Sequence, residues 1–101
     1  MGSRLELQEI LEELLGSENV YFQPPETIKL VYPCIIYGRN NIDVRYADDN
    51  PYKLHQQYKI TIIDKNPDSE IPMRMSLLPM SRFERHYTVD NLNHDVYNIY
   101  Y

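Results

Sequence analysis

The chain of 101 residues has no tryptophan, one cysteine and three glycines. The lone Cys34 cannot form an internal disulfide, and no CxxC or His-Cys cluster indicates a zinc site. It lies in the apolar run 30–37, where a free cysteine is typical of a small buried hydrophobic residue. The few glycines form no loop that could cradle a nucleotide phosphate, and HxH, HExxH and GxSxG motifs are absent. These absences argue against an enzyme.

Positive charge is also scarce, since 10 Lys and Arg face 15 Asp and Glu and give a formal net charge of −5 at pH 7. Nucleic-acid binders usually carry a basic patch, because neutralising phosphates drives their affinity. Here the basic residues are dispersed among acidic ones. No apolar run approaches the length of a membrane span, and the start lacks a signal-peptide pattern. We therefore expect a soluble protein from a reducing compartment, without a membrane partner.

Tyrosine is the abundant residue, with ten copies against two of phenylalanine. Tyrosine is enriched at protein–protein interfaces, because its ring is apolar and its tip is polar. It also favours half-buried strands for intrinsic reasons. The count leaves both interpretations open.

Two segments have helical patterns. Residues 3–15 begin with a capping box, Ser3 with Glu6, and Gly16 is placed to end the helix. The spacing of three and four residues predicts a single apolar stripe, formed by Leu7, Ile10, Leu11 and Leu14. A second, shorter helix is predicted between residues 69 and 79, where Ile71, Met75 and Leu78 recur at helical spacing.

The remaining pattern is that of strands. Residues 20–22 form a short strand that prolines end, and residues 29–37 form another, with a turn at 38–41. Alternation predicts strands at 42–46 and 56–63, separated by a polar loop at 47–51. Two further strands flank the turn 90–93, and Phe83, Arg85, Tyr87 and Val89 are expected to share a face.

These elements predict one α+β domain over residues 1–101. The N-terminal helix and the short second helix pack on one face of an antiparallel sheet, and the chain ends in a C-terminal β-hairpin. We interpret residues 1–3 as partly derived from a cloning vector. Residues 18–23 fit the ExxYxQ pattern of a potyviral protease site, but we interpret them as native because Pro24 would obstruct cleavage.

The histidines invite a search for an active site or a metal site. His55, His86, His94 and Asp95 could supply a base or metal ligands, but their spacing matches no motif. We interpret His86 and His94 as cross-strand neighbours that bond each other or nearby carboxylates. No catalytic, cofactor-binding or metal-binding residue is therefore assigned, and no cofactor is expected.

Contact with other subunits is the alternative role for the polar and aromatic clusters. Acidic residues at 43, 48 and 49 lack the spacing of a calcium loop and indicate a charged β-hairpin that projects from the sheet. The chain ends on aromatic residues, and a terminus frays unless something holds it. The interface candidates are Asp43, Arg45, Tyr46, Asp48, Asp49, Tyr97, Ile99, Tyr100 and Tyr101.

Four segments carry a family resemblance: NVYFQPP at 19–25, LVYPCIIY at 30–37, YKITIIDKNPDS at 58–69 and DNLNHD at 90–95. With them the chain resembles small structural proteins of the head–tail module of long-tailed phages of Gram-positive bacteria. It is most similar to the tail-terminator or tail-completion family, over nearly its whole length. That family has an antiparallel sheet flanked by helices and needs no catalytic residues.

The resemblance implies a homo-oligomeric ring, usually a hexamer, that caps the tail tube and joins it to the head connector proteins. DNA would pass through the lumen without specific binding. The expected location is the head–tail junction of the virion, and the host cytoplasm during assembly. Three alternatives remain open: a head-completion or connector protein of the same module, an adaptor that binds peptides by β-augmentation, and an enzyme based on His and Asp.

Overall fold

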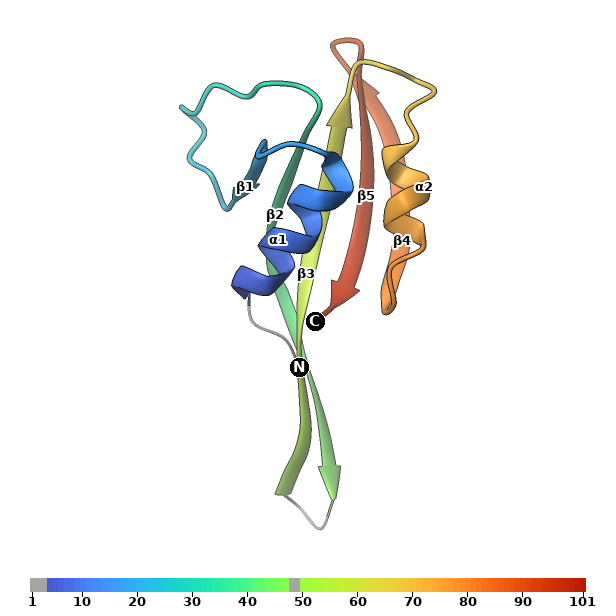
Figure 1. Ribbon diagram of the computed structural model, residues 1–101. Coiled ribbons are helices and arrows are strands. Elements are labelled where there is room, and N and C mark those ends of the chain that lie inside the picture. The colour runs from blue at the N-terminus through green and yellow to red at the C-terminus, as the bar shows by residue number, and fades with distance from the viewer. Residues whose placement is uncertain (1–3, 48–49) are drawn as a thin grey trace.

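The computed structural model describes residues 4–47 and 50–101, and over residues 41–55 it describes the backbone alone. The described residues form two helices and five strands, arranged as Figure 1 shows. In chain order they are α1 (Arg4–Leu15), β1 (Val20–Phe22), β2 (Cys34–Ala47), β3 (Asn50–Asp64), α2 (Ile71–Ser76), β4 (Ser81–Val89) and β5 (Leu92–Tyr100). The prediction of an α+β fold is confirmed.

The five strands form one sheet in the order β1-β2-β3-β5-β4. Three of the pairs are antiparallel, but β1 runs parallel to β2, with Val20 opposite Ile35. The sheet is therefore mixed, and the prediction of a wholly antiparallel sheet is wrong in this respect. The cause lies in the loop 23–33, which returns the chain to the start of β1 before β2 begins.

β2 differs most from its sequence pattern. Residues 29–33 lie outside any strand, and the predicted turn at 38–41 is part of one continuous strand with a register shift between Arg39 and Asn41. A β-bulge absorbs the extra residue there, so the strand continues instead of turning. At Gly38 a Cβ atom would lie 3.1 Å from Cγ of Gln23, so a larger residue would require the Gln23 side chain to shift.

β2 and β3 pair along their whole length, from Cys34 opposite Ile63 out to Ala47 opposite Asn50. Figure 1 shows that the outer part of this hairpin extends beyond the other strands. The molecule is accordingly elongated, with principal dimensions of 51, 26 and 23 Å.

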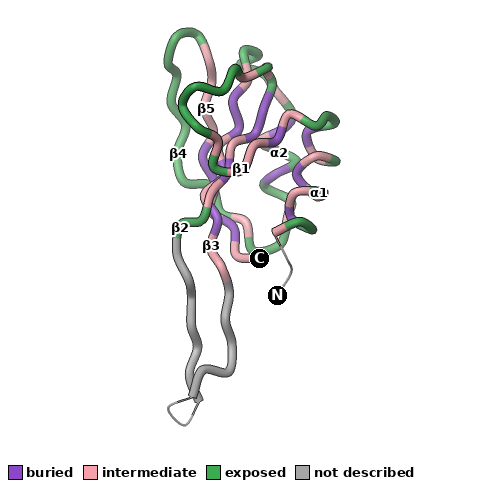
Figure 2. The backbone as a smooth tube through the Cα atoms, turned by 90° about the vertical axis from the view of Figure 1, so that its left-hand side faces the viewer, coloured by how far each residue is buried: buried purple, intermediate pink, exposed green. Residues whose placement is uncertain are grey.

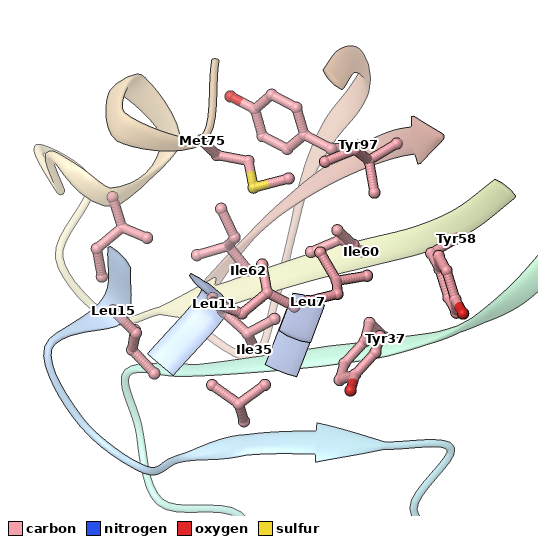
Figure 3. Close-up of a cluster of buried hydrophobic side chains, with 13 residues drawn as sticks. Leu7, Leu11, Leu15, Ile35, Tyr37, Tyr58, Ile60, Ile62, Met75 and Tyr97 are labelled. Carbon is pink, nitrogen blue, oxygen red and sulfur yellow. The ribbon is translucent and has the colours of Figure 1, made fainter. Parts of the chain in front are cut away.

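The core joins both helices to the central strands (Figure 3). Leu7, Leu11 and Leu15 of α1 are buried, so the buried stripe follows a spacing of four and leaves Ile10 and Leu14 only half-buried. Gly16 ends α1 with a φ of +82°, a conformation that suits glycine, and its N–H donates to the Glu12 carbonyl at 2.9 Å. The predicted stop at Gly16 is confirmed. The other core members are Val20, Ile35, Tyr37, Tyr58, Ile60, Ile62, Ile71, Met75, Tyr97 and Ile99.

A bulge in β4 changes which residues share a face. The register shifts between Phe83 and Arg85, so Phe83 lies opposite Tyr97 whereas Tyr87 lies opposite His94. Tyr97 and His94 are an odd number of residues apart on β5 and so point to opposite faces of the sheet. The prediction that Phe83 shares a face with Tyr87 is therefore wrong.

Candidate assembly surface

The last strand of the sheet, β4, has β5 as its neighbour on one side and no strand of the described chain on the other. Eight of its nine residues are exposed, and Figure 2 shows it as an exposed strand next to the more buried β5. An unpaired edge presents backbone N–H and C=O groups that can pair with another chain. The bulge between Phe83 and Arg85 interrupts this edge, whereas residues 85–89 stay in regular register.

Large apolar side chains flank this edge. Leu77 is 84% exposed and Met73 is 73% exposed, because α2 turns Ile71 and Met75 into the core and these two residues outward. Exposed apolar residues that gather in one place mark an interaction surface more than scattered ones do. We call this the β4-edge surface: strand β4, in which Phe83 is 54% exposed, with Met73, Leu77 and Met80.

Charge is distributed unequally among the helices and β4. The elements α2 and β4 contain three arginines and one glutamate, and ion pairs of Arg74 with Glu70 at 3.5 Å and of Glu84 with Lys59 at 3.6 Å offset part of the charge. Helix α1, which contacts α2, β1 and β2, contains four glutamates and one arginine, a formal −3. The acidic charge is thus concentrated on α1.

The two histidines of the terminal strands point to opposite faces of the sheet. Nδ1 of His86 lies 2.9 Å from a carboxylate oxygen of Asp95, its cross-strand partner. His94 stacks on Tyr87 with ring centroids 4.6 Å apart, and its Nδ1 lies 3.0 Å from the Leu92 carbonyl oxygen. A bond from His86 to a carboxylate was expected, whereas a bond between the two histidines is excluded by this register. The side chain of His55 lies outside the described residues.

Metal-binding groups of three or more His, Cys, Asp or Glu side chains are not found in the part of the chain that the structure describes. Cys34 is buried, and burial raises the pKa of its thiol to about 11, with a further contribution from the charge of Asp64. Because the thiolate is the reactive form, this cysteine is chemically quiet at neutral pH.

Two of the predicted interface residues pack inside the subunit. Tyr97 is 2% exposed and Ile99 is 4% exposed, and both belong to the core cluster. The Tyr97 hydroxyl donates to the Pro72 carbonyl at 2.7 Å and lies 2.8 Å from the Ser76 hydroxyl, while burial raises its pKa. In the single subunit, these two side chains anchor β5 to the core and to α2.

The other candidates divide into two groups. Tyr100 and Tyr101 are half-buried at the end of β5, where the Tyr101 hydroxyl donates to Glu6 at 3.3 Å. The backbone of Asp43, Arg45 and Tyr46 belongs to the outer part of β2, and their side chains are outside the described residues. Asp48 and Asp49 are also outside the described residues. Among the candidates with described side chains, Tyr97 and Ile99 lie in the core, and Tyr100 and Tyr101 lie half-buried at the end of β5.

The β4-edge surface was not among the sequence predictions. Its signal was nevertheless present: in the second helix, Met73 and Leu77 recur four residues apart, next to a second apolar pair at 71 and 75. A short helix that is apolar on two sides needs two partners. The sheet covers one of these sides.

A groove lies away from the β4 edge, between the loop 23–33 and strands β2 and β3. It has a volume of about 480 Å³ and is open to solvent. Its apolar wall comes from Pro24, Pro25, Ile28, Leu30 and Ile36, and Arg39 and Lys59 stand among its polar lining. Gln23 holds the loop in place, since its N–H donates to the Tyr37 carbonyl and its side-chain oxygen accepts from the Arg39 N–H.

Comparison with known proteins places the chain in no family, because no family model and no curated protein matches it. Neither helix of the described chain has the length and apolar character needed to cross a membrane.

Proposed function

We propose that this protein is a structural subunit of a phage tail, a tail-terminator or tail-completion protein that forms a ring on the tail tube. The observation that carries the proposal is the β4-edge surface, an open strand beside exposed apolar side chains. A monomeric protein usually protects such an edge. Here the edge is long and only partly interrupted by a bulge, which favours a partner chain as its natural cover.

The family resemblance of the sequence gives this surface a biological setting. A ring needs a head-to-tail contact that closes on itself, and a sheet with two unlike edges supplies two unlike contact surfaces. In such a ring the helices α1 and α2 would form one layer over the sheet. The tail tube and the head connector would then contact the ends of the ring, and DNA would pass through the lumen without specific binding.

The long β2–β3 hairpin is the second support for this proposal. Its outer strands extend beyond the rest of the sheet, so they can reach a neighbouring subunit or another ring. The charged positions 43, 45, 48 and 49 belong to this segment of the chain. Mixed charge at the rim of a contact sets its register and specificity more than its affinity.

Two other functions share part of this support. A head-completion or connector protein of the same module would also assemble through an open edge. An adaptor that binds an extended peptide by β-augmentation would use β4 in the same way, but as a monomer. Mass measurement in solution over a range of protein concentrations separates the adaptor, which stays monomeric, from a protein that assembles.

Localisation in virus particles tests the proposal directly. We expect cryo-electron microscopy of the phage that encodes this chain to show its density as a ring at the junction of head and tail. A gold-labelled antibody against the protein should mark the same point. Density inside the head connector would favour the connector protein, and particles that lack the protein would contradict both functions.

The histidines provide a test of the non-catalytic assignment. We expect the double substitution His86→Ala and His94→Ala to leave assembly intact, because the open edge of β4 pairs through backbone groups, which both substitutions keep. An activity or a bound metal that the double variant loses would support an enzyme instead.

A further inference from the structure

The outer part of the β2–β3 hairpin and the groove beside the loop 23–33 suggest how neighbouring copies meet, an inference that rests on the proposed assembly function. We call residues 43–47 and 50–55 the arm, because β2 and β3 pair there with each other and with no other described strand. We propose that the arm of one copy docks in the groove of a second copy.

The arm is a two-stranded ribbon that needs a cover. Pairing of β3 with β5 ends at Gln57 opposite Tyr100, whereas β2 and β3 continue to pair as far as Ala47 opposite Asn50. An isolated two-stranded hairpin is only marginally stable in water and needs a third strand or another packing partner. A neighbouring copy can supply that partner.

The groove lies on the face of the sheet that the helices leave open. Ile35, Tyr37 and Ile60 belong to the core cluster with residues of α1 and α2 (Figure 3). Side chains alternate along a strand, so Ile36 and Thr61, which line the groove, point to the opposite face. The groove is therefore an apolar recess on the helix-free face of the subunit.

This helix-free face carries most of the basic side chains of the sheet. The register places Lys59, Arg82 and Arg85 on it, since their partners on β5 are Asn98 and Val96. Those two partners are two residues apart and so share a face. The ion pair between Lys59 and the carboxylate at position 84 offsets one of the three charges. An anionic partner suits this face, although the whole chain is acidic.

The outer end of the arm has the complementary chemistry. Residues 46–52 read YADDNPY, with two aspartates, two tyrosines and no lysine or arginine, a formal −2. Among the residues that line the groove, Arg39 and Lys59 stand against Glu26. Nε of Arg39 donates to the neutral amide oxygen of Gln56 at 3.2 Å. Aromatic rings also suit the proline and aliphatic wall of the groove, so apolar character and charge favour the same occupant.

The fold makes this contact one between different copies. β2 runs as one continuous strand from Cys34 to Ala47, and Figure 1 shows the loop 23–33 and the outer end of the hairpin at opposite ends of the molecule. The arm of a copy therefore points away from its own groove. Arm and groove are different surfaces, so the contact is heterologous, and each copy retains one arm or groove for the next neighbour.

Thiol cross-linking of a variant with Glu26→Cys and Ala47→Cys tests this arrangement. Position 26 is exposed at the groove, and position 47 is the last residue of β2 in the arm. The native Cys34 is buried, so a short bismaleimide reagent should react with the two introduced thiols alone. We expect a ladder of cross-linked dimers, trimers and higher species on a denaturing gel. Each single-cysteine variant alone should stay uncross-linked, and a mixture of the two should stop at dimers.

The matched control pairs Ala47→Cys with Leu5→Cys, because Leu5 is 64% exposed on α1, on the other face of the sheet. This control should give no ladder. Dimers from Ala47→Cys alone would show that two arms meet each other and would overturn the proposal. The absence of cross-links from the variant with both Glu26→Cys and Ala47→Cys would overturn it as well, and would leave a different anionic partner as the occupant of the groove.

A charge exchange provides the second measurement. We expect Arg39→Glu with Lys59→Glu to weaken self-association about tenfold or more, as like-charge contacts do. Asp48→Lys with Asp49→Lys should do the same, and the four substitutions together should restore most of the association. Sedimentation velocity measures all three variants, and the absence of any recovery in the fourfold variant would contradict the contact.

The acidic surface of α1 offers the control for this exchange. Glu9→Lys with Glu13→Lys changes the charge of the chain as much as the substitutions in the arm do, but both residues are exposed on the helix, away from the groove. We expect this variant to associate like the unmodified protein. A tenfold loss here would show an effect of net charge alone and would contradict the specific contact.

The outcome is separable from that of the proposed function. A ring at the head–tail junction without cross-links between positions 26 and 47 would remove this contact and keep the function. Cross-linked products that stop at dimers in the variant with both cysteines would show two copies that exchange arms, which would overturn the head-to-tail repeat. A ladder from a protein that virus particles lack would keep the contact and remove the function.

Discussion

The strands β4 and β5 are neighbours of equal length, nine residues each, and they lie in contrasting surroundings. In β5, Val96, Tyr97 and Ile99 are buried, whereas in β4 Phe83, Tyr87 and Val89 are exposed. β5 contains five apolar or aromatic residues and β4 contains three. Position adds to this difference, because β5 has a strand on each side and β4 ends the sheet. β5 stabilises the subunit, and β4 is available to a partner.

Truncation of β5 should give the largest loss of stability. Deleting residues 99–101 removes the buried Ile99 and two backbone bonds, from Tyr100 N–H to the Met80 carbonyl and from Tyr101 N–H to the Gln56 carbonyl. We expect the free energy of unfolding to fall by about 4 kcal/mol or more, since loss of one buried Ile side chain alone costs about 2–5 kcal/mol. Circular dichroism during denaturant unfolding measures it. A truncated protein that unfolds at the same midpoint would contradict the anchoring role of β5.

A matched pair of alanine substitutions should show the contrast within single side chains. We expect Ile99→Ala in β5 to destabilise the fold by about 2–5 kcal/mol, because it leaves a cavity in the core. Val89→Ala in β4, where the side chain is 50% exposed, should change stability by about 0.5 kcal/mol or less. Equal changes in the unfolding midpoints of the two variants would refute the distinction.

Removing a hydroxyl group should give a smaller difference. Tyr97→Phe deletes the bond to the Pro72 carbonyl and the contact with Ser76, which together attach β5 to α2. We expect a loss of about 1 kcal/mol, the usual value for one hydrogen bond. Tyr87→Phe is the control in β4, since its ring stacks on His94 and should keep that contact. Thermal unfolding should separate the two variants, and an unchanged midpoint for Tyr97→Phe would argue against this attachment.

Alkaline pH should lower the stability of the fold by a smaller amount, through titratable residues of the core. Burial raises the pKa of Cys34, Tyr37 and Tyr97, so each is held in its neutral form in the folded state. The unfolded chain ionises first, beginning near the ordinary thiol pKa of 9.0, and stability should fall as pH rises above that value. Denaturant midpoints at neutral and alkaline pH measure the decline. Cys34→Ala should lose the earliest part of it, and a midpoint that rises with pH would contradict the assignment.

Local patterns predicted the elements more reliably than their arrangement. The short strand at 20–22, the stop at Gly16 and the second helix are all in the structure. The predictions for the face of Phe83 and for a turn at 38–41 are wrong, because the register shifts between Phe83 and Arg85 in β4 and between Arg39 and Asn41 in β2. A bulge depends on the partner strand, and no local pattern reveals the partner.

The candidate surface illustrates the same limit. The place of Tyr97 and Ile99 near the end of the chain predicts contact residues, and the fold buries them. Nothing in the spacing of Met73 and Leu77 marks them as exposed, because apolar residues at helical spacing usually belong to a core. Whether such a residue is covered depends on what packs against its helix, which is a property of the whole fold.

The sequence by itself determined the two helices and the short first strand, because caps, periodicity and residue type act over a few neighbouring residues. The tertiary structure alone decided that β1 pairs in parallel, that β2 continues through its bulge, and that β4 ends the sheet. These features depend on contacts between residues far apart in the chain, where strand order and register are selected by burying one common core.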